Sequence, residues 1–345
     1  LNMSKRKLSN LQKSRIRAVQ EQRLERAKDG NSITIHKIDN VDDLGPEISG
    51  TVVSNFGTQV DVEANDGDLN GKIIRCHMRS NLDPLVTGDK VIWRFGEPYG
   101  VVVARIDRYS ELIRPDAYGK LRPVAANVDV IAIVFSPKPT AFSNLIDRYL
   151  VAAEAQNIQP ILILNKTDLD TENEFSSINQ LVHDYKSIGY DVLSVSAKTA
   201  DGFESLEDYL CNKTAIFVGQ SGVGKSSLIN RLQPQANAVV GSLSIGKEKG
   251  THTTTVSRLF HFAHGGVLID SPGIREFSLT HLTQEQVINS FIDFRPYLGR
   301  CKFRDCLHKS EPGCSLLDAI SQKKILQSRF DNYHQIIMSQ ESERR

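Results

Sequence analysis

The chain has 345 residues, 40% of them hydrophobic, and its 42 Lys and Arg nearly balance its 41 Asp and Glu. This length suits two or three domains, and the near-neutral net charge hides an uneven distribution along the chain. No apolar run approaches the ~20 residues of a membrane-spanning helix, and no charged-then-apolar segment indicates a signal peptide. We therefore expect a cytoplasmic protein with no membrane partner.

We expect residues 1–33 to form a basic N-terminal arm. Residues 1–30 carry nine Lys or Arg against three acidic residues, with few large apolar side chains. Such a segment cannot pack a core alone and is typical of an arm that binds a polyanion. A merely solvated helix or a frayed terminus is the alternative.

Short β-type segments separated by turn signals predict a β-rich domain over residues 34–112. The candidate strands are residues 50–55, 58–64, 71–78, 89–95 and 100–106. The sequences NDGD at 65–68 and TGD at 87–89 provide hairpin-type turns. Five strands in so short a segment favour a small closed barrel, and an OB-fold is the natural candidate, whose open face commonly binds nucleic acid. A structural β-domain without a ligand is the alternative.

From about residue 115 the pattern changes to strands that alternate with helices. Strands are predicted at 128–136, 160–165, 190–197, 215–219 and 265–270, and helices at 143–156, around 174–188 and from 225. This alternation predicts an α/β domain with a parallel, doubly wound sheet over residues 113–278. The remainder, 279–345, is expected to be a mostly helical domain.

The sequence GQSGVGKS at 219–226 fits the phosphate-loop (P-loop) pattern G-x-x-x-x-G-K-[ST] in full, between a predicted strand and a predicted helix. Lys225 is expected to reach the β- and γ-phosphates of a nucleotide, and the Ser226 hydroxyl to hold Mg²⁺. DSPG at 270–273 ends another predicted strand. Asp270 is therefore expected near the Mg²⁺, and the Gly273 N–H at the γ-phosphate.

Two further motifs at strand ends predict recognition of guanine. In NKTD at 165–168, the Asp168 carboxylate can accept hydrogen bonds from guanine N1–H and N2–H₂, a donor pair that adenine lacks. Lys166 can lay its stem along the base, and Asn165 can brace the loop. SAK at 196–198 could place the Ala197 N–H on guanine O6.

The order of these motifs is the reverse of the usual one, in which the P-loop comes first and the base-reading motif last. A nucleotide site at the carboxyl edge of a parallel sheet depends on proximity in space and not on sequence order. The chain is therefore predicted to be a circular permutation that keeps the site intact.

Residues 301–314 carry three cysteines and one histidine, which are Cys301, Cys306, His308 and Cys314. Three thiolates and an imidazole are the ligand set of a closed, structural, tetrahedral zinc site. Reduced cysteines that cluster by chance are the alternative. Basic side chains around them are placed to meet RNA phosphates, namely Arg300, Lys302, Arg304 and Lys309.

In both motif order and domain order the chain resembles the circularly permuted GTPases, most closely the family of bacterial small-ribosomal-subunit biogenesis GTPases. The resemblance covers nearly the whole chain, including the C-x₄-C-x-H-x₅-C spacing. It implies GTP hydrolysis coupled to late maturation of the 30S subunit, direct contact with 16S rRNA, Mg²⁺ bound with GTP or GDP, and one structural Zn²⁺. It also implies that Thr254 contacts Mg²⁺ and the γ-phosphate and that His252 orients the attacking water. Neighbouring threonines remain rival Mg²⁺ ligands, namely Thr251, Thr253 and Thr255.

The expected site residues fall into three groups. Those that bind GTP are Asn165, Lys166, Thr167, Asp168, Ser196, Ala197, Lys198, Gly219, Gln220, Ser221, Gly222, Val223, Gly224, Lys225, Ser226, Ser227, Asp270 and Gly273. Those expected in catalysis are His252, Lys225 and Thr254, and those at Mg²⁺ are Ser226, Thr254 and Asp270. Ile274 stands where many GTPases carry a water-orienting Gln, and no arginine finger is evident, so we expect slow turnover that a partner raises.

Three alternatives stay open. The chain could be a P-loop ATPase or kinase in which NKTD is accidental, a module whose nucleotide site is only regulatory, or a GTPase that serves another RNA or the large subunit. A K⁺ ion is not expected, because Gly222 stands where K⁺-dependent relatives carry an Asn. The chain is expected to be a monomer.

Overall fold

A computed structural model describes residues 44–80, 82–116, 118–169, 172–233, 257–270 and 279–343. Its internal contacts divide the chain into two compact units. Across the described ranges, no helix has both the length and the apolar character needed to cross a membrane. The domain boundaries predicted after residues 33 and 278 lie outside these ranges, and the boundary after residue 112 stays a prediction.

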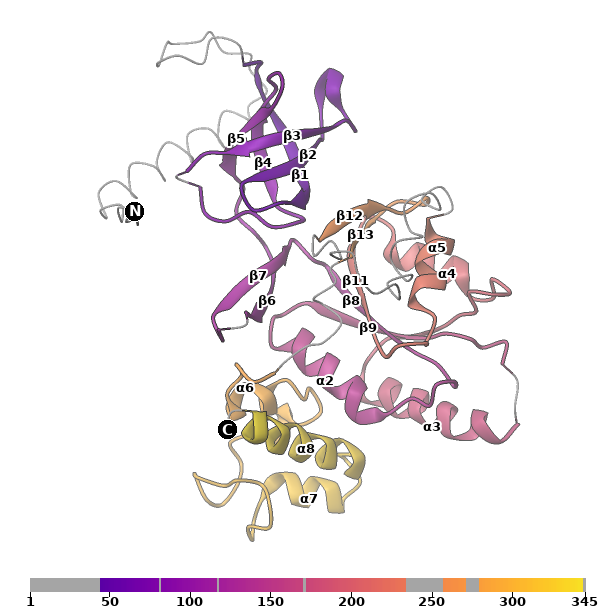
Figure 1. Cartoon of the computed structure of the whole chain (residues 1–345). Helices are drawn as coiled ribbons and strands as arrows, with labels where there is room; N and C mark the ends of the chain where they lie inside the picture. The colour runs from indigo at the N-terminus through magenta and orange to yellow at the C-terminus, as the bar shows by residue number, and fades with distance from the viewer. Residues whose placement is uncertain are drawn as a thin grey trace. The chain divides into compact units, whose positions relative to one another are not determined.

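A five-stranded barrel forms the first unit (Figure 1). Its strands are β1 (Glu47–Asn55), β2 (Gln59–Ala64), β3 (Ile73–Met78), β4 (Lys90–Arg94) and β5 (Gly100–Arg105), and the 3₁₀ helix η1 (Gly67–Leu69) follows β2. Neighbouring strands follow the order β1-β2-β3-β5-β4, and β4 pairs again with β1, which closes the barrel. This OB-like barrel confirms the predicted five-stranded domain.

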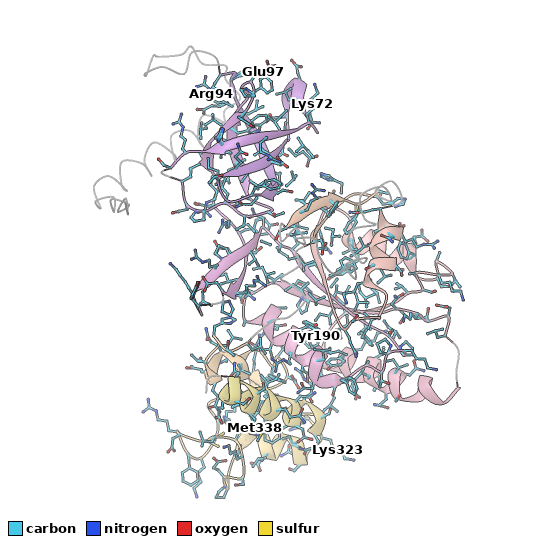
Figure 2. The ribbon with its side chains drawn as sticks, in the orientation of Figure 1. Lys72, Arg94, Glu97, Tyr190, Lys323 and Met338 are labelled. Atoms are coloured by element: carbon cyan, nitrogen blue, oxygen red, sulfur yellow. The ribbon has the colours of Figure 1, made fainter. Side chains whose placement is uncertain are left out.

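The barrel closes because β1 is long enough to serve two neighbours. Its residues 47–51 pair with β4 and its residues 50–55 pair with β2, with a register shift between Val52 and Ser54. Such a bulge bends a strand, which barrel closure requires. Arg94, labelled in Figure 2, donates hydrogen bonds of 2.7 Å to the carbonyls of Leu44 and Gly45, so the chain is held where it approaches β1.

A two-stranded sheet consists of β6 (Glu111–Pro115) and β7 (Leu121–Ala126), which the sequence pattern does not predict. Prolines and charged side chains interrupt the alternation by which strands are recognised. The Asp116 carboxylate accepts hydrogen bonds from the N–H groups of Tyr118 (2.9 Å) and Lys120 (3.0 Å), which stabilises the turn between the two strands.

A parallel sheet is the centre of the second unit. Its strands lie in the order β10 (Val192–Ser194), β9 (Gln159–Leu164), β8 (Val130–Phe135), β11 (Thr214–Val218) and β13 (Val267–Asp270), and β12 (Arg258–His261) precedes β13 in the chain. Every pair of neighbours from β10 to β13 is parallel. All residues of β8 are buried, as expected for a strand covered on both faces.

Helices cover both faces of this sheet, which confirms the predicted doubly wound α/β class. On one face, α4 (Phe203–Leu210) and α5 (Lys225–Leu232) share a core with β8, β9 and β11. The helices α2 (Ser143–Glu154) and α3 (Glu172–Ile188) pack against β8, β9 and β10 (Figure 1). The carboxyl edge of the sheet is left to the loops that follow the strands.

The C-terminal part is helical, as predicted, and consists of α6 (Gln284–Asn289), the 3₁₀ helix η4 (Arg295–Tyr297), α7 (Ser315–Ser321) and α8 (Gln327–Glu343). Helix α6 starts with a capping box, in which the Thr283 side chain accepts from the Gln286 N–H and the Gln286 side chain accepts from the Thr283 N–H. Phe291, Phe294 and Tyr333 pack together in the core of this part, which also includes Val151 and Ala152 of α2. The C-terminal helices therefore share one hydrophobic core with a helix of the parallel-sheet domain.

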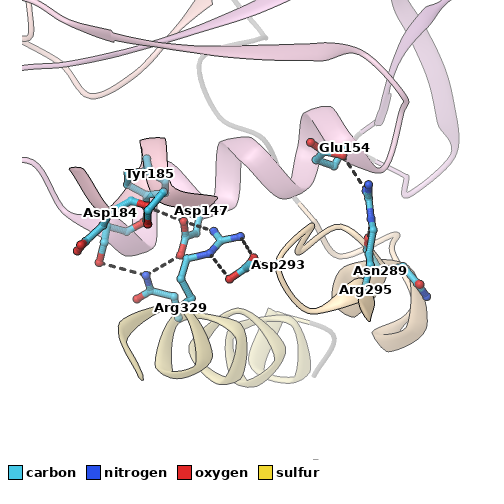
Figure 3. Close-up of polar contacts among 11 residues, drawn as sticks. Asp147, Glu154, Asp184, Tyr185, Asn289, Asp293, Arg295 and Arg329 are labelled. Carbon is cyan, nitrogen blue, oxygen red and sulfur yellow. Dashed lines mark hydrogen bonds and ion pairs between the residues drawn. The ribbon is translucent and has the colours of Figure 1, made fainter. Parts of the chain in front are cut away.

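A buried polar network joins α2 to α8 beside this core (Figure 3). The Arg329 guanidinium donates to Asp147 of α2 at 2.5 Å and to Asp293 at 2.7 Å. Asp147, which is fully buried, also accepts from the Tyr185 hydroxyl at 2.6 Å and from the Asn332 amide at 2.7 Å. Burial works to lower the pKa of Arg329, but Asp147 and Asp293 raise it well above its ordinary value, so Arg329 is charged.

Candidate nucleotide-binding site and metal centre

Four loops that carry the predicted nucleotide motifs leave the same edge of the parallel sheet. Asn165 directly follows β9, Ser196 comes shortly after β10, Gly219 directly follows β11, and Asp270 is the last residue of β13. Because the carboxyl ends of parallel strands meet at one edge, segments far apart in the sequence lie together there.

The Asn165 side chain connects three of these segments. Its amide nitrogen donates to the Val223 carbonyl of the P-loop at 2.9 Å, and its amide oxygen accepts from the Ala197 N–H at 3.2 Å. Asn165 is 1% exposed, so these hydrogen bonds are made away from solvent. The first, second and third motifs in the chain therefore meet in space, although their order is reversed.

Lys166 makes a second connection to the P-loop. Its Nζ donates to the carbonyl of Gly222 at 2.6 Å and to the carbonyl of Lys138 at 2.7 Å. Its backbone has a φ of 65°, in the left-handed region that few residues other than glycine adopt. A strained backbone held by side-chain contacts is often a feature of a functional loop.

The Asp168 carboxylate is held by the loop that follows β10. The Ser196 hydroxyl donates to its Oδ1 at 2.7 Å, and the Lys198 Nζ lies 3.8 Å from its Oδ2. The Ser196 hydrogen bond lowers the pKa of Asp168 against the opposing effect of burial, and the charges of Lys198 and Lys166 lower it further. The carboxylate is thus an ionised acceptor with a fixed orientation, which is what two adjacent N–H donors of a base require.

The P-loop turns tightly before α5 begins at Lys225. Gly219 and Gly224 have φ values of 140° and 94°, and a Cβ atom would lie 2.1 Å from the Val134 carbonyl oxygen at Gly219 and 2.3 Å from the Asn165 amide nitrogen at Gly224. The Lys225 Nζ donates to the carbonyls of Gly219 (2.6 Å) and Gln220 (2.7 Å). The cation is therefore already positioned over the loop that would surround phosphates.

Several predicted residues lie outside the described ranges. These are Gly273, His252, Thr254, Ile274 and the rival threonines Thr251, Thr253 and Thr255. Of the predicted Mg²⁺ ligands, Ser226 lies in the first turn of α5 and Asp270 at the end of β13, a strand adjacent to β11.

One loop at this edge was not identified from the sequence. Residues 136–139 follow β8, and the Lys138 carbonyl accepts from both the Ser136 hydroxyl (2.8 Å) and the Lys166 Nζ. The sequence did carry a signal for this loop, because SPKP begins at the last residue of a predicted buried strand, and the other motifs also lie at strand ends. It was missed because it matches no motif and contributes a carbonyl instead of a side chain.

The four predicted metal ligands come together in the C-terminal part. One ligand atom from each of Cys301, Cys306, His308 and Cys314 lies within 4.8 Å of the other three. The His308 Nδ1 is 3.5 Å from the Cys301 Sγ and 3.4 Å from the Cys314 Sγ. Three sulfur atoms and one nitrogen at this spacing can coordinate a single metal ion.

Contacts around the cluster fix its loop. The Glu311 carboxylate accepts from the N–H groups of Leu307 (3.0 Å), Lys309 (2.8 Å) and Ser310 (3.0 Å). The hydrogen bonds from its own N–H and from these three N–H groups lower the pKa of Glu311 to about 2. The carboxylate is therefore charged when it holds the loop. His308, between these residues, has a φ of 59°, and the imidazole of His334 on α8 contacts its carbonyl oxygen at 3.1 Å.

Comparison with known proteins agrees with these features. A family model described as RsgA GTPase matches residues 105–280. The small ribosomal subunit biogenesis GTPase RsgA of Pseudomonas syringae pv. syringae is 51% identical over 98% of this chain and 98% of its own, and that of Azotobacter vinelandii has the same identity and coverage.

Solved structures are also similar to this chain. YjeQ from Thermotoga maritima is 30% identical, with a TM-score of 0.69 over 86% of this chain and 99% of its own. YloQ, described as a circularly permuted GTPase, is 30% identical, with a TM-score of 0.68 over 89% of this chain and 99% of its own. With the family model matching half of the chain and these relatives covering nearly all of it, the chain belongs to the RsgA GTPase family.

Proposed function

We propose that this chain hydrolyses GTP and that it acts in biogenesis of the small ribosomal subunit, as the names of its relatives indicate for them. The observation that carries the proposal is the bridging Asn165 side chain, which joins the base-reading loop, the Ala197 loop and the P-loop. The ionised Asp168 beside these loops favours guanine over adenine, because adenine lacks the pair of N–H donors that a carboxylate can accept.

The proposal assigns roles to the predicted residues that would contact the base, the phosphates and Mg²⁺. Asp168 accepts from the guanine N1–H and N2–H₂, and the Ala197 N–H donates to O6. Lys225 and the P-loop N–H groups bind the phosphates, and the Gly273 N–H meets the γ-phosphate. Ser226, Asp270 and Thr254 would hold Mg²⁺, which neutralises phosphate charge when bound.

We further propose that the 30S subunit raises GTP turnover and that the chain contacts 16S rRNA as a cytoplasmic monomer. The basic segment 1–33 supports RNA contact. So do the basic residues within and next to the segment that carries the cysteine and histidine cluster, which are Arg300, Lys302, Arg304 and Lys309. GTP turnover measured alone, with 30S subunits and with 50S subunits tests this. We expect 30S subunits, but not 50S subunits, to raise GTP turnover. Equal stimulation by 50S subunits would contradict the proposal, and so would faster turnover of ATP than of GTP in a parallel assay.

Replacing His252 with alanine is expected to lower kcat for GTP by about tenfold or more, because the imidazole is proposed to orient the attacking water. The affinity for GDP should barely change. Single-turnover kinetics and GDP titration measure the two quantities. His264→Ala is the matched control, because His264 lies in the turn after β12, pairs with Glu207 at 3.0 Å and should leave kcat unchanged. Undiminished turnover of the His252 variant would reject the role.

We propose that the cysteine and histidine cluster holds one structural Zn²⁺. Metal analysis of the purified chain should give one zinc per chain, and Cys314→Ala should abolish it, because Cys314 is the buried member of the set. The same variant should lower the melting temperature, since Cys314 belongs to the core of the C-terminal helices. Cys211→Ala, at an exposed cysteine outside the cluster, should retain the zinc. A Cys314 variant that retains one zinc would show that the ligand set is wrong.

A further inference from the structure

We propose that Arg231 is a positioning residue for guanine recognition. It lies in the last turn of α5, the helix that begins with Lys225 of the P-loop. The inference rests on the proposed function, because it assigns Arg231 to the loop that would contact guanine O6. None of the sequence motifs includes this residue.

Two contacts direct the Arg231 guanidinium toward the Ala197 loop. Its Nη1 donates to the Ala197 carbonyl at 3.1 Å. Its guanidinium carbon lies 5.2 Å from the ring centroid of Phe203, the first residue of α4, which is 5% exposed. Because the guanidinium lies over one face of the Phe203 ring, the Arg231 side chain has a defined orientation even though it is solvent-accessible.

Ala197 is consequently held at both of its peptide groups. Asn165 accepts from its N–H, and Arg231 donates to its C=O. The proposed contact of this residue with guanine uses the same N–H, which would be shared between the Asn165 amide oxygen at 3.2 Å and O6 of the base. By fixing the peptide that follows Ala197, Arg231 therefore restricts the backbone rotations that change the direction of this N–H, without contacting the nucleotide itself.

Asp168 is positioned mainly by other contacts, although one of them uses the Lys198 N–H, which belongs to the peptide whose carbonyl Arg231 binds. Its carboxylate is held by the Ser196 hydroxyl, which in turn accepts from the N–H groups of Lys198 (3.2 Å) and Thr199 (3.1 Å). Because the Thr199 N–H also donates to Ser196 and the Lys198 Nζ lies near Asp168, loss of Arg231 should affect recognition at the 6-position of the base more than recognition of the 2-amino group. This separation distinguishes a positioning role from a general structural one.

The same helix would also connect the two ends of a bound nucleotide. Lys225 and Arg231 are six residues apart, about 9 Å along a helix axis. Lys225 at one end is bonded to P-loop carbonyls, and Arg231 near the other end is bonded to the loop proposed to contact the base. A displacement of α5 at its phosphate end would therefore also move Arg231, and with it the Ala197 loop that is proposed to contact the base.

The test compares the affinities of three nucleotides for the full chain and its variants. GDP is the reference, 6-thio-GDP replaces O6 with a poorer acceptor, and IDP lacks the 2-amino group. We expect Arg231→Ala to reduce the preference for GDP over 6-thio-GDP by about fivefold, which corresponds to the free energy of one hydrogen bond, and to change the preference for GDP over IDP by a smaller factor. Arg231→Lys, which can still donate to the carbonyl, should be intermediate, and Asn230→Ala in the same helical turn should match the unaltered chain.

Each outcome is decisive. If Arg231→Ala keeps the preference for GDP over 6-thio-GDP, weakens binding of all three nucleotides equally, or lowers both preferences by the same factor, the inference is overturned. If the unaltered chain binds GDP no more tightly than IDP, the proposed recognition of guanine by Asp168 fails, and with it the proposed function, independently of Arg231. Should Arg231→Ala not fold, as judged by circular dichroism, the comparison of Arg231→Lys with Asn230→Ala decides between the same two results.

Discussion

Replacing Asp168 with asparagine is expected to convert a guanine-selective site into a xanthine-selective one. The carboxylate accepts two N–H donors of guanine, whereas an asparagine amide presents one acceptor and one donor, which matches the N1–H and C2 carbonyl of xanthine. A site built to hydrogen-bond a ligand group rejects analogues that lack it by a factor of about 10⁴. We expect GTP affinity to fall by about 100-fold or more, with XTP becoming the preferred nucleotide.

The substitution keeps the shape of the side chain, so the Ser196 hydroxyl can still donate to the remaining oxygen at position 168. Competition titration with GTP, XTP and ATP gives the affinities. Asp184→Asn makes the same chemical change near the end of α3, at the opposite edge of the sheet from the nucleotide loops, and should leave the preference for GTP unaltered. Unchanged GTP affinity in the Asp168 variant would mean that NKTD does not read the base.

The nucleotide motifs could be predicted from the sequence because each one lies at or just after the end of an apolar strand. Strand type and strand end can both be read from local pattern, and the parallel arrangement then brings the ends together. The Asn165 bridge follows from that logic, since one short amide side chain can reach only adjacent loops. The barrel was predictable for a similar reason, because its turns carry glycine and aspartate at the required positions.

Neither Arg231 nor the network around Asp147 could be predicted from the sequence, because their contacts join residues that are distant in the chain. Asp147 and Arg329 are 182 residues apart, and each occupies an ordinary position in an amphipathic helix. A charged residue in such a helix is normally exposed, so nothing local indicates burial. Only the tertiary packing of α8 on α2 removes these charges from water and makes them partners.

Arg329→Ala is expected to destabilise the unit that contains the parallel sheet and the C-terminal helices by about 3–5 kcal/mol. The loss is large because the substitution leaves the fully buried Asp147, and the 9% exposed side chain of Asp293, without their cation (Figure 3). Urea denaturation monitored by circular dichroism measures the free energy of unfolding. Combining Arg329→Met with Asp147→Asn should recover part of the loss, because the second substitution removes the uncompensated charge on α2.

A second ion pair between α2 and the C-terminal part provides a matched control for the Arg329 substitution. Arg295 also pairs with a carboxylate of α2, that of Glu154 at 2.7 Å, but its side chain is 48% exposed. Since solvent screens an exposed pair, Arg295→Ala should cost no more than about 1 kcal/mol. Equal costs for the two variants would show that burial does not set the strength of the Arg329 contacts. If the predicted difference is found, the buried charge pair holds α8 against α2 more strongly than the exposed pair holds Arg295 against the same helix.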